Sequence, residues 1–167
     1  MTIIRDNPAT LTAIKNCIGK TISDISRVQY YFNEKENEEG DGILEFSFND
    51  NSYLTLTELG DGESMLAYNE KANIPDTSFN VTDKDVCSWK RLDLKEDRDW
   101  KKIIGQTLQA TEIIWDKNNF GDSLVACILH FDSDFVTFYA TYSDDTKFLI
   151  NERPSWVDKD TRIEKIK

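Results

Sequence analysis

The chain contains two similar halves, and an internal repeat restricts the possible folds more than any other feature of this sequence. Ile-Gly-Lys-Thr-Ile at residues 18–22 reappears as Ile-Gly-Gln-Thr-Leu at residues 104–108. Three further segments recur in the same order: residues 44–48 match 127–131, residues 52–56 match 134–138, and residues 66–70 match 148–152. Because the order is kept, we expect two superposable units whose matched residues occupy equivalent places.

Each half begins with apolar residues three and four positions apart, a spacing typical of a short helix that packs on a sheet. These residues are Leu11, Ile14, Cys17 and Ile18 in the first half, and Trp100, Ile103 and Ile104 in the second. Gly19 and Gly105 follow them. Glycine commonly ends a helix because it tolerates a left-handed backbone, so we expect a helix to end before each glycine.

The remainder of each half has the pattern of a four-stranded antiparallel meander. A strand is expected near residues 21–32 and again near residues 107–116, each followed by a polar loop. Alternating apolar and polar residues then indicate strands with one buried face, joined by turns rich in Asn and Asp. The predicted matched core positions are Leu44 with Cys127, Phe46 with Leu129, Phe48 with Phe131, Leu54 with Val136, Leu56 with Phe138, Leu66 with Phe148 and Tyr68 with Ile150.

These patterns predict an α+β fold, mostly antiparallel β, in a single domain over residues 1–167. It consists of two tandem four-stranded meander repeats, each preceded by a short helix, and this order of elements resembles the Whirly-type arrangement. The repeats span about residues 11–71 and 98–154, with a connecting segment at residues 72–97 and a C-terminal tail at residues 155–167. Residues 86–94 suit an extra strand, and Trp156, Ile163 and Ile166 have a helical spacing in the tail.

The charge of the chain restricts its partners. It has 20 Lys and Arg against 31 Asp and Glu, for a formal net charge of −11. Phosphate binding needs a cationic surface, so a basic protein is the expected partner rather than nucleic acid. No apolar run approaches the roughly 20 residues of a membrane span. Asp6 and Pro8 stand where a signal peptide needs an apolar core, so we expect a cytoplasmic protein that does not bind membranes.

The cysteines argue against metal and redox chemistry. Cys17, Cys87 and Cys127 are widely spaced and form no CxxC pair, so neither a disulfide nor a metal site is expected. Cys17 and Cys127 stand where the other half has Ile103 and Leu44. We therefore expect both to be buried and to pack as small hydrophobic side chains.

His130 is the single histidine, and its counterpart in the first half is Ser47. We expect it on the exposed face of a strand, because no nucleophile or orienting carboxylate stands at a recognisable spacing for general-base catalysis. The Asp-rich turn at residues 132–134 lacks the later glycine and glutamate of an EF-hand calcium loop. Glycine-rich phosphate loops are also absent, so we predict neither an enzyme nor a cofactor.

Acidic loops form the candidate functional site. The loop at residues 33–42 is crowded with acids, and only Lys35 offsets them. The candidate residues are Glu34, Glu36, Glu38, Glu39 and Asp41 in this loop, Asp61 and Glu63 in the next acidic loop, and Asp144 and Asp145 in the counterpart of that second loop. Two interpretations remain open: a solvated surface that maintains solubility, or a docking surface whose field speeds association with a basic protein.

The size, the acidity and the repeat-built sheet together resemble bacterial toxin-immunity proteins, in particular those of contact-dependent growth inhibition systems. The resemblance implies a non-catalytic cytoplasmic protein that neutralises a toxin domain delivered by a neighbouring cell. A nuclease toxin would be basic because it binds phosphates. An exposed strand edge offers the toxin a second way to bind, by strand addition.

Two other hypotheses belong to different classes. A phage-type acidic DNA mimic that acts against host defence would need acids spaced along an extended surface. A hydrolase or a ligand carrier would use a sheet-lined pocket. The sequence leaves the oligomeric state open.

Overall fold

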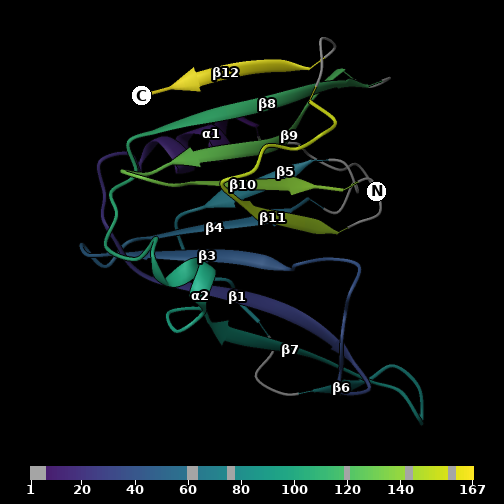
Figure 1. Ribbon diagram of the computed structural model, residues 1–167. Helices are drawn as coiled ribbons and strands as arrows, with labels where there is room; N and C mark the ends of the chain where they lie inside the picture. The colour runs from purple at the N-terminus through teal and green to yellow at the C-terminus, as the bar shows by residue number, and fades with distance from the viewer. Residues whose placement is uncertain (1–6, 60–63, 75–77, 119–120, 142–144, 158–160) are drawn as a thin grey trace.

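A computed structural model describes residues 7–59, 64–74, 78–118, 121–141, 145–157 and 161–167. Antiparallel strands dominate and two short helices accompany them, which confirms the predicted α+β class (Figure 1). The elements are α1 (Asn7–Lys15), β1 (Ile22–Phe32), β2 (Lys35–Glu36), β3 (Ile43–Phe48), β4 (Tyr53–Glu58), β5 (Met65–Tyr68), β6 (Phe79–Asn80), β7 (Val86–Asp93), α2 (Arg98–Lys101), β8 (Ala110–Asn118), β9 (Gly121–His130), β10 (Phe135–Ala140), β11 (Thr146–Ile150) and β12 (Arg162–Ile166).

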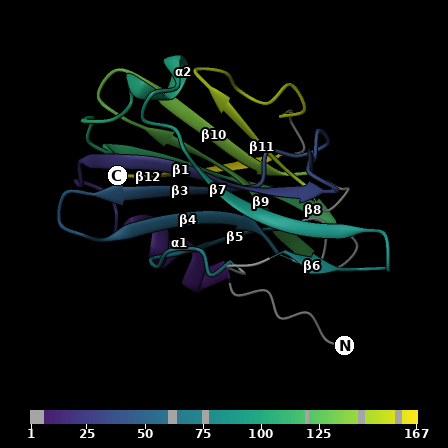
Figure 2. The same cartoon turned by 90° about the horizontal axis from the view of Figure 1, so that it is seen from below.

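The strands form two sheets that face each other across a shared core (Figures 1 and 2). The first sheet has the order β5-β4-β3-β1-β7-β6, with β2 paired to β1, and the second has the order β11-β10-β9-β8-β12. In each sheet, four strands of a meander lie side by side, and a later strand pairs with the free side of the first. That later strand is β7 in the first sheet, so the extra strand predicted within residues 86–94 is confirmed.

The prediction of a helix in the C-terminal tail is wrong. Residues Arg162–Ile166 form β12, which pairs antiparallel with β8 and places Ile163 opposite Ile114 and Ile166 opposite Thr111. The backbone groups on the outer side of β8 need hydrogen-bond partners, and a strand supplies them where a helix would not. This backbone pairing outweighs the helical spacing of a few apolar side chains.

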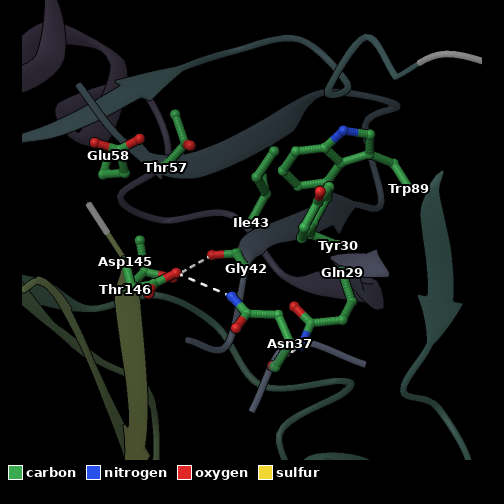
Figure 3. A pocket seen from close by; sticks show the side chains of 10 residues that line it. All are labelled: Gln29, Tyr30, Asn37, Gly42, Ile43, Thr57, Glu58, Trp89, Asp145 and Thr146. Carbon is green, nitrogen blue, oxygen red and sulfur yellow. Dashed lines mark hydrogen bonds between the residues drawn. The ribbon is translucent and has the colours of Figure 1, made fainter. Parts of the chain in front are cut away.

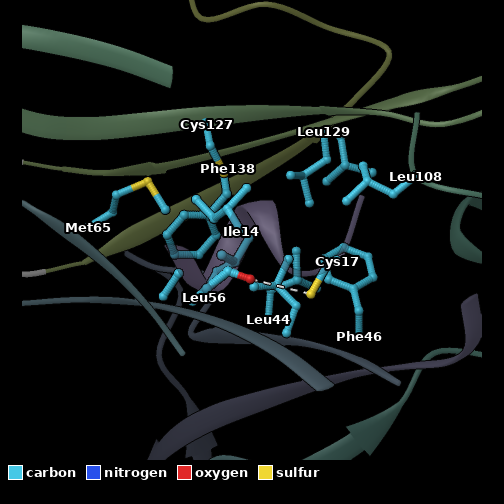
Figure 4. Close-up of a cluster of buried hydrophobic side chains, with 14 of the residues drawn as sticks. Ile14, Cys17, Leu44, Phe46, Leu56, Met65, Leu108, Cys127, Leu129 and Phe138 are labelled. Atoms are coloured by element: carbon cyan, nitrogen blue, oxygen red, sulfur yellow. Dashed lines mark hydrogen bonds between the residues drawn. The ribbon is translucent and has the colours of Figure 1, made fainter. Parts of the chain in front are cut away.

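One apolar core contains side chains from both sheets, as Figure 4 shows. Leu44 lies opposite Leu56 in the first sheet, and Cys127 lies opposite Phe138 in the second, so these predicted counterparts have matching cross-strand neighbours. The predicted core positions found buried are Leu44, Phe46, Phe48, Leu54, Leu56, Cys127, Leu129, Phe131, Val136 and Phe138.

The predicted register of β5 is wrong by one residue. Leu66 and Tyr68 are only half-buried and lie outside the core, whereas Met65 and Ala67 are buried within it. Ala67 faces Leu56, and its amide donates to the buried Thr10 hydroxyl of α1 at 3.4 Å. The helix lies beside β5 (Figure 2), and the small alanine side chain leaves room for it.

The two sheets are joined where their first strands begin. Thr21 and Thr107 form an antiparallel bridge, with their hydroxyls 2.7 Å apart. The Gly19 amide donates to the Leu108 carbonyl at 2.8 Å, and the Gly105 amide donates to the Ile22 carbonyl at 2.9 Å. Both glycines have positive φ, 89° and 91°, which other residues rarely adopt. When the matched segments 18–22 and 104–108 are exchanged, each of the two glycine hydrogen bonds becomes the other, so the contacts have a local two-fold symmetry.

All three cysteines are free and buried, so the predicted burial of Cys17 and Cys127 is confirmed. Burial raises the pKa of the Cys17 thiol to about 11 and also raises the pKa of the Cys127 thiol. We expect a brief pulse of thiol reagent to leave both unmodified in the native protein and to label them after unfolding, as read by mass spectrometry. Rapid native labelling would contradict this.

Cys127→Leu should lower the free energy of unfolding by at most about 1–3 kcal/mol, the cost of overpacking the core with a larger side chain.

Candidate functional site

Residues 33–42, here called the acidic hairpin, fold back onto the first sheet. Strand β2 pairs with the end of β1, with Tyr31 opposite Glu36 and Phe32 opposite Lys35. Asn33 has a φ of 50° and Glu34 a φ of 68°, the left-handed conformations of a tight two-residue turn that matches strand twist. The predicted acidic loop therefore contains the strand β2, which pairs with the end of β1 and extends the first sheet.

A buried glutamine holds the acidic hairpin in place. Gln29 is 1% exposed, and its side-chain amide donates to the carbonyls of Asn37 at 2.7 Å and Gly40 at 3.2 Å. At the end of the hairpin, Gly42 has a φ of 87°, and a Cβ there would lie 2.2 Å from the Val28 carbonyl oxygen. Only glycine fits this close approach, and together with the hydrogen bonds of Gln29 it defines the path of the hairpin.

Two of the predicted acids connect the sheets instead of facing solvent freely. The Asp41 amide donates to the Thr146 carbonyl at 2.9 Å, and its carboxylate accepts from the Phe148 amide at 2.8 Å. These bonds cover part of the edge of β11, so we assign Asp41 a structural role. Asp145 accepts from the Asn37 side chain at 3.2 Å (Figure 3), which brings acids from distant loops together.

The other acids of the hairpin, Glu34, Glu36, Glu38 and Glu39, are exposed. Glu36 pairs with Arg27, and Glu34 lies 3.5 Å from Lys90. In the part of the chain that the structure describes, Glu38 and Glu39 have no ion-pair partner, so their charges face solvent uncompensated. The remaining predicted site residues, Asp61, Glu63 and Asp144, lie outside the described residues.

An open groove of about 570 Å³ runs beside these carboxylates. It is lined by Tyr30, Phe32, Lys35, Glu36, Asn37, Glu38 and Glu39. Phe32 is 43% exposed, although most aromatic side chains of this size are buried. The sequence analysis did not predict a role for Phe32. The feature that could have indicated it is the aromatic run from Tyr30 to Phe32, directly before the acidic residues.

A smaller cavity of about 90 Å³ lies next to this groove (Figure 3). The rings of Tyr30 and Trp89, which are opposite each other on β1 and β7, form one wall with their centroids 5.1 Å apart. Ile43 and the acids Glu58 and Asp145 also line it. The Tyr30 hydroxyl lies 2.8 Å from Cys87 Sγ, and this hydrogen bond raises the pKa of Tyr30. Tyr30 and Asn37 line both cavities, so the two are adjacent.

His130 is half-buried at the end of β9 and has an orienting carboxylate that no sequence spacing indicated. Its Nε2 lies 2.6 Å from Oε2 of the buried Glu112, which also accepts from Arg153 at 2.6 Å. The contact was hidden in the sequence because it depends on the register of β8 and β9. A cavity beside this cluster is lined by Glu112, His130 and Arg153 and also by Thr111. The Thr111 hydroxyl donates a hydrogen bond to the buried Ile128 carbonyl at 3.1 Å. Glu112 therefore joins β8 to His130 of β9 and to Arg153 of the segment that follows β11.

No protein-family model, curated protein or solved structure matches this chain. Neither helix in the described residues has the length and hydropathy needed to cross a membrane. Within the same residues, no three His, Cys, Asp or Glu side chains are grouped so that they could hold a metal ion.

Proposed function

We propose that this chain is a non-catalytic immunity protein that binds and neutralises a basic toxin domain, of nuclease type, in the bacterial cytoplasm. The observation that carries the proposal is an ordered hairpin that presents the uncompensated carboxylates of Glu38 and Glu39 beside the exposed ring of Phe32. A nuclease needs cationic groups to bind phosphates, and an acidic surface complements those groups.

The hydrogen bonds that hold the acidic hairpin against β1 support a binding role over a role in solubility alone. Solubility requires exposed charge but no particular conformation. Here the buried Gln29 amide fixes the backbone of the hairpin, and Gly42 fixes its return to β3. A surface that is ordered before binding loses less conformational entropy in the complex. The exposed Phe32 ring would serve as the apolar anchor that such interfaces usually contain.

We also propose that the two sheets are copies of one unit, as the matched segments predict. The exchange of hydrogen bonds around Thr21 and Thr107 supports this, as does a second matched contact: Thr55 donates to the Glu70 carbonyl and Thr137 to the Glu152 carbonyl. In the second sheet, β8 ends at Asn118 and β9 begins at Gly121. The acidic hairpin occupies the same connection in the first sheet, so the unit does not need it to fold. The Whirly-like arrangement stays a prediction.

The test compares two variants with the same change in net charge. One carries Glu34→Gln, Glu38→Gln and Glu39→Gln in the hairpin. Its control carries glutamine at three exposed acids elsewhere: Glu70, Glu96 and Glu152. Association with the product of the neighbouring upstream gene, which the proposal predicts to be a basic protein, is measured by stopped flow. We expect the hairpin variant to associate at least about tenfold more slowly than the control at low salt. The difference should shrink as salt shortens the Debye length to about 8 Å or less.

The two variants should differ little in stability, because surface substitutions usually change it by less than about 0.5 kcal/mol. Equal association rates at low salt would contradict the proposed role of the hairpin. An upstream gene that encodes no basic protein would contradict the proposed partner. Displacement of DNA from a DNA-binding protein by the wild-type chain would instead support the DNA-mimic alternative.

A further inference from the structure

We infer that the cavity in Figure 3 is a receptor for one arginine side chain of a protein partner. The inference rests on the proposed function, because it names the group by which a basic partner would be held. It adds a specific contact to what the acidic hairpin provides, which is long-range attraction.

The size of the cavity selects the end of a side chain. Its volume of about 90 Å³ is several times the roughly 10–15 Å³ that one water molecule needs on the same measure. It is well below the roughly 300–1,000 Å³ of pockets that enclose drug-sized ligands. A guanidinium group with its adjoining methylene is of a suitable size, whereas a nucleotide or a cofactor is not.

The aromatic wall favours a planar cation. Tyr30 and Trp89 lie with their rings tilted by 56°, and Ile43 lies beside them in the cavity (Figure 3). A cation near the face of a tryptophan or tyrosine ring is attracted by the ring quadrupole. The guanidinium of arginine also stacks on aromatic rings, which the ammonium of lysine cannot do.

The charges that line the cavity are negative. Glu58 and Asp145 are both among its lining residues, and these residues include no lysine or arginine. Asp145 accepts a hydrogen bond from the amide of Asn37, a neutral group. A Cβ at Gly40 would lie 2.4 Å from Asp145 Oδ1, so the absence of a side chain there lets the carboxylate keep its place. A fixed carboxylate beside an aromatic wall complements the forked donors of arginine.

The cavity also has a suitable position. Because it shares Tyr30 and Asn37 with the groove along the acidic hairpin, an arginine that enters it would be surrounded by the exposed carboxylates. Charges at the rim of an interface mainly set the association rate, whereas a desolvated charge pair mainly sets the dissociation rate. The cavity and the hairpin are therefore expected to act on different rate constants.

The first test needs no partner. Tryptophan indole signals are followed by ¹⁵N NMR while N-acetyl-arginine-methylamide is added, with Trp89→Phe used to assign the signal of Trp89. The neutral, nearly isosteric N-acetyl-citrulline-methylamide is the matched control probe. We expect the arginine probe to shift the Trp89 signal in a saturable manner at millimolar concentration. The citrulline probe should shift it at least tenfold less, and Asp145→Asn should abolish the response to arginine.

Equal responses to the two probes, or an unchanged response in Asp145→Asn, would overturn the inference. Asp93→Asn, an exposed acid on the same strand as Trp89, is the control variant and should respond like the wild type. This outcome does not depend on whether the partner is a toxin, so it can fail or succeed separately from the proposed function.

The second test uses the complex with the basic partner. Asp145→Asn should raise the dissociation rate at least tenfold and change the association rate less than twofold, the reverse of the pattern expected for the hairpin variant. Replacing one arginine of the partner by citrulline should remove most of this difference. If the complex forms and depends on the hairpin, yet dissociates at the same rate in Asp145→Asn, the proposed function stands and the arginine receptor does not.

Discussion

Arg91→Ala should lower the free energy of unfolding by about 3–5 kcal/mol, because it leaves a buried carboxylate without its counter-ion. Glu45 is 3% exposed, and Arg91 binds it with two hydrogen bonds, Nε to Oε1 at 2.7 Å and Nη2 to Oε2 at 3.1 Å. The hydrogen bond to Glu45 raises the pKa of Arg91. Both side chains also bind the backbone of Ala72, at 2.6 and 2.7 Å, so the pair attaches the segment after β5 to the outer face of the first sheet.

Lys90→Ala is the matched control on the same strand. Lys90 lies 3.5 Å from Glu34, but both side chains are largely exposed, and such pairs contribute at most about 1 kcal/mol. The double variant Glu45→Leu with Arg91→Leu should regain part of the loss, since it removes the buried charge. It should not regain all of it, because the Ala72 amide and carbonyl lose their partners. Urea denaturation of the four proteins measures these differences. Similar losses for Arg91→Ala and Lys90→Ala would contradict the argument.

The elements that the sequence predicted best are those in which local pattern and tertiary packing agree. Leu44, Phe46 and Phe48 alternate with polar residues, and all three are buried in the core. The prediction failed in the tail, where apolar residues at helical spacing form β12. A few apolar side chains in a short segment fit either a helix or a strand, and pairing with the free side of β8 selects the strand. This pairing cannot be predicted until the order of the strands in the sheet is known.

The candidate site, too, could be predicted from the sequence only in part. Composition was enough to find the acidic hairpin, because a run of carboxylates is apparent in any sequence. Composition could not separate Asp41, which binds the backbone of β11, from Glu38 and Glu39, which face solvent. It also missed Gln29, whose single buried amide orders the hairpin. These roles depend on which strands lie side by side, and one sequence does not specify that register.

Glu112→Gln should lower the free energy of unfolding by about 1–3 kcal/mol at neutral pH, and this loss should disappear in acid. Glu112 is 4% exposed and accepts hydrogen bonds from His130 and Arg153. Burial raises its pKa, but the bonds from Arg153 and His130 outweigh burial, so the folded-state pKa lies below the ordinary 4.5. The unfolded chain therefore takes up the proton first as the pH falls. The stabilisation is complete above about pH 4.5 and is lost as the pH falls through the folded-state pKa.

Urea denaturation of the wild type and Glu112→Gln across pH 3–7 measures this linkage. The difference between the two should be constant at the upper end of the range and should decline below about pH 4.5. Glu96→Gln, at an exposed carboxylate, is the control and should differ from the wild type by less than about 0.5 kcal/mol at every pH. Arg153 comes from the segment that leads to β12, so losing its partner should also weaken the attachment of that segment to the second sheet. A pH-independent difference would mean that Glu112 stabilises the fold through packing and neutral hydrogen bonds, and that its charge contributes nothing.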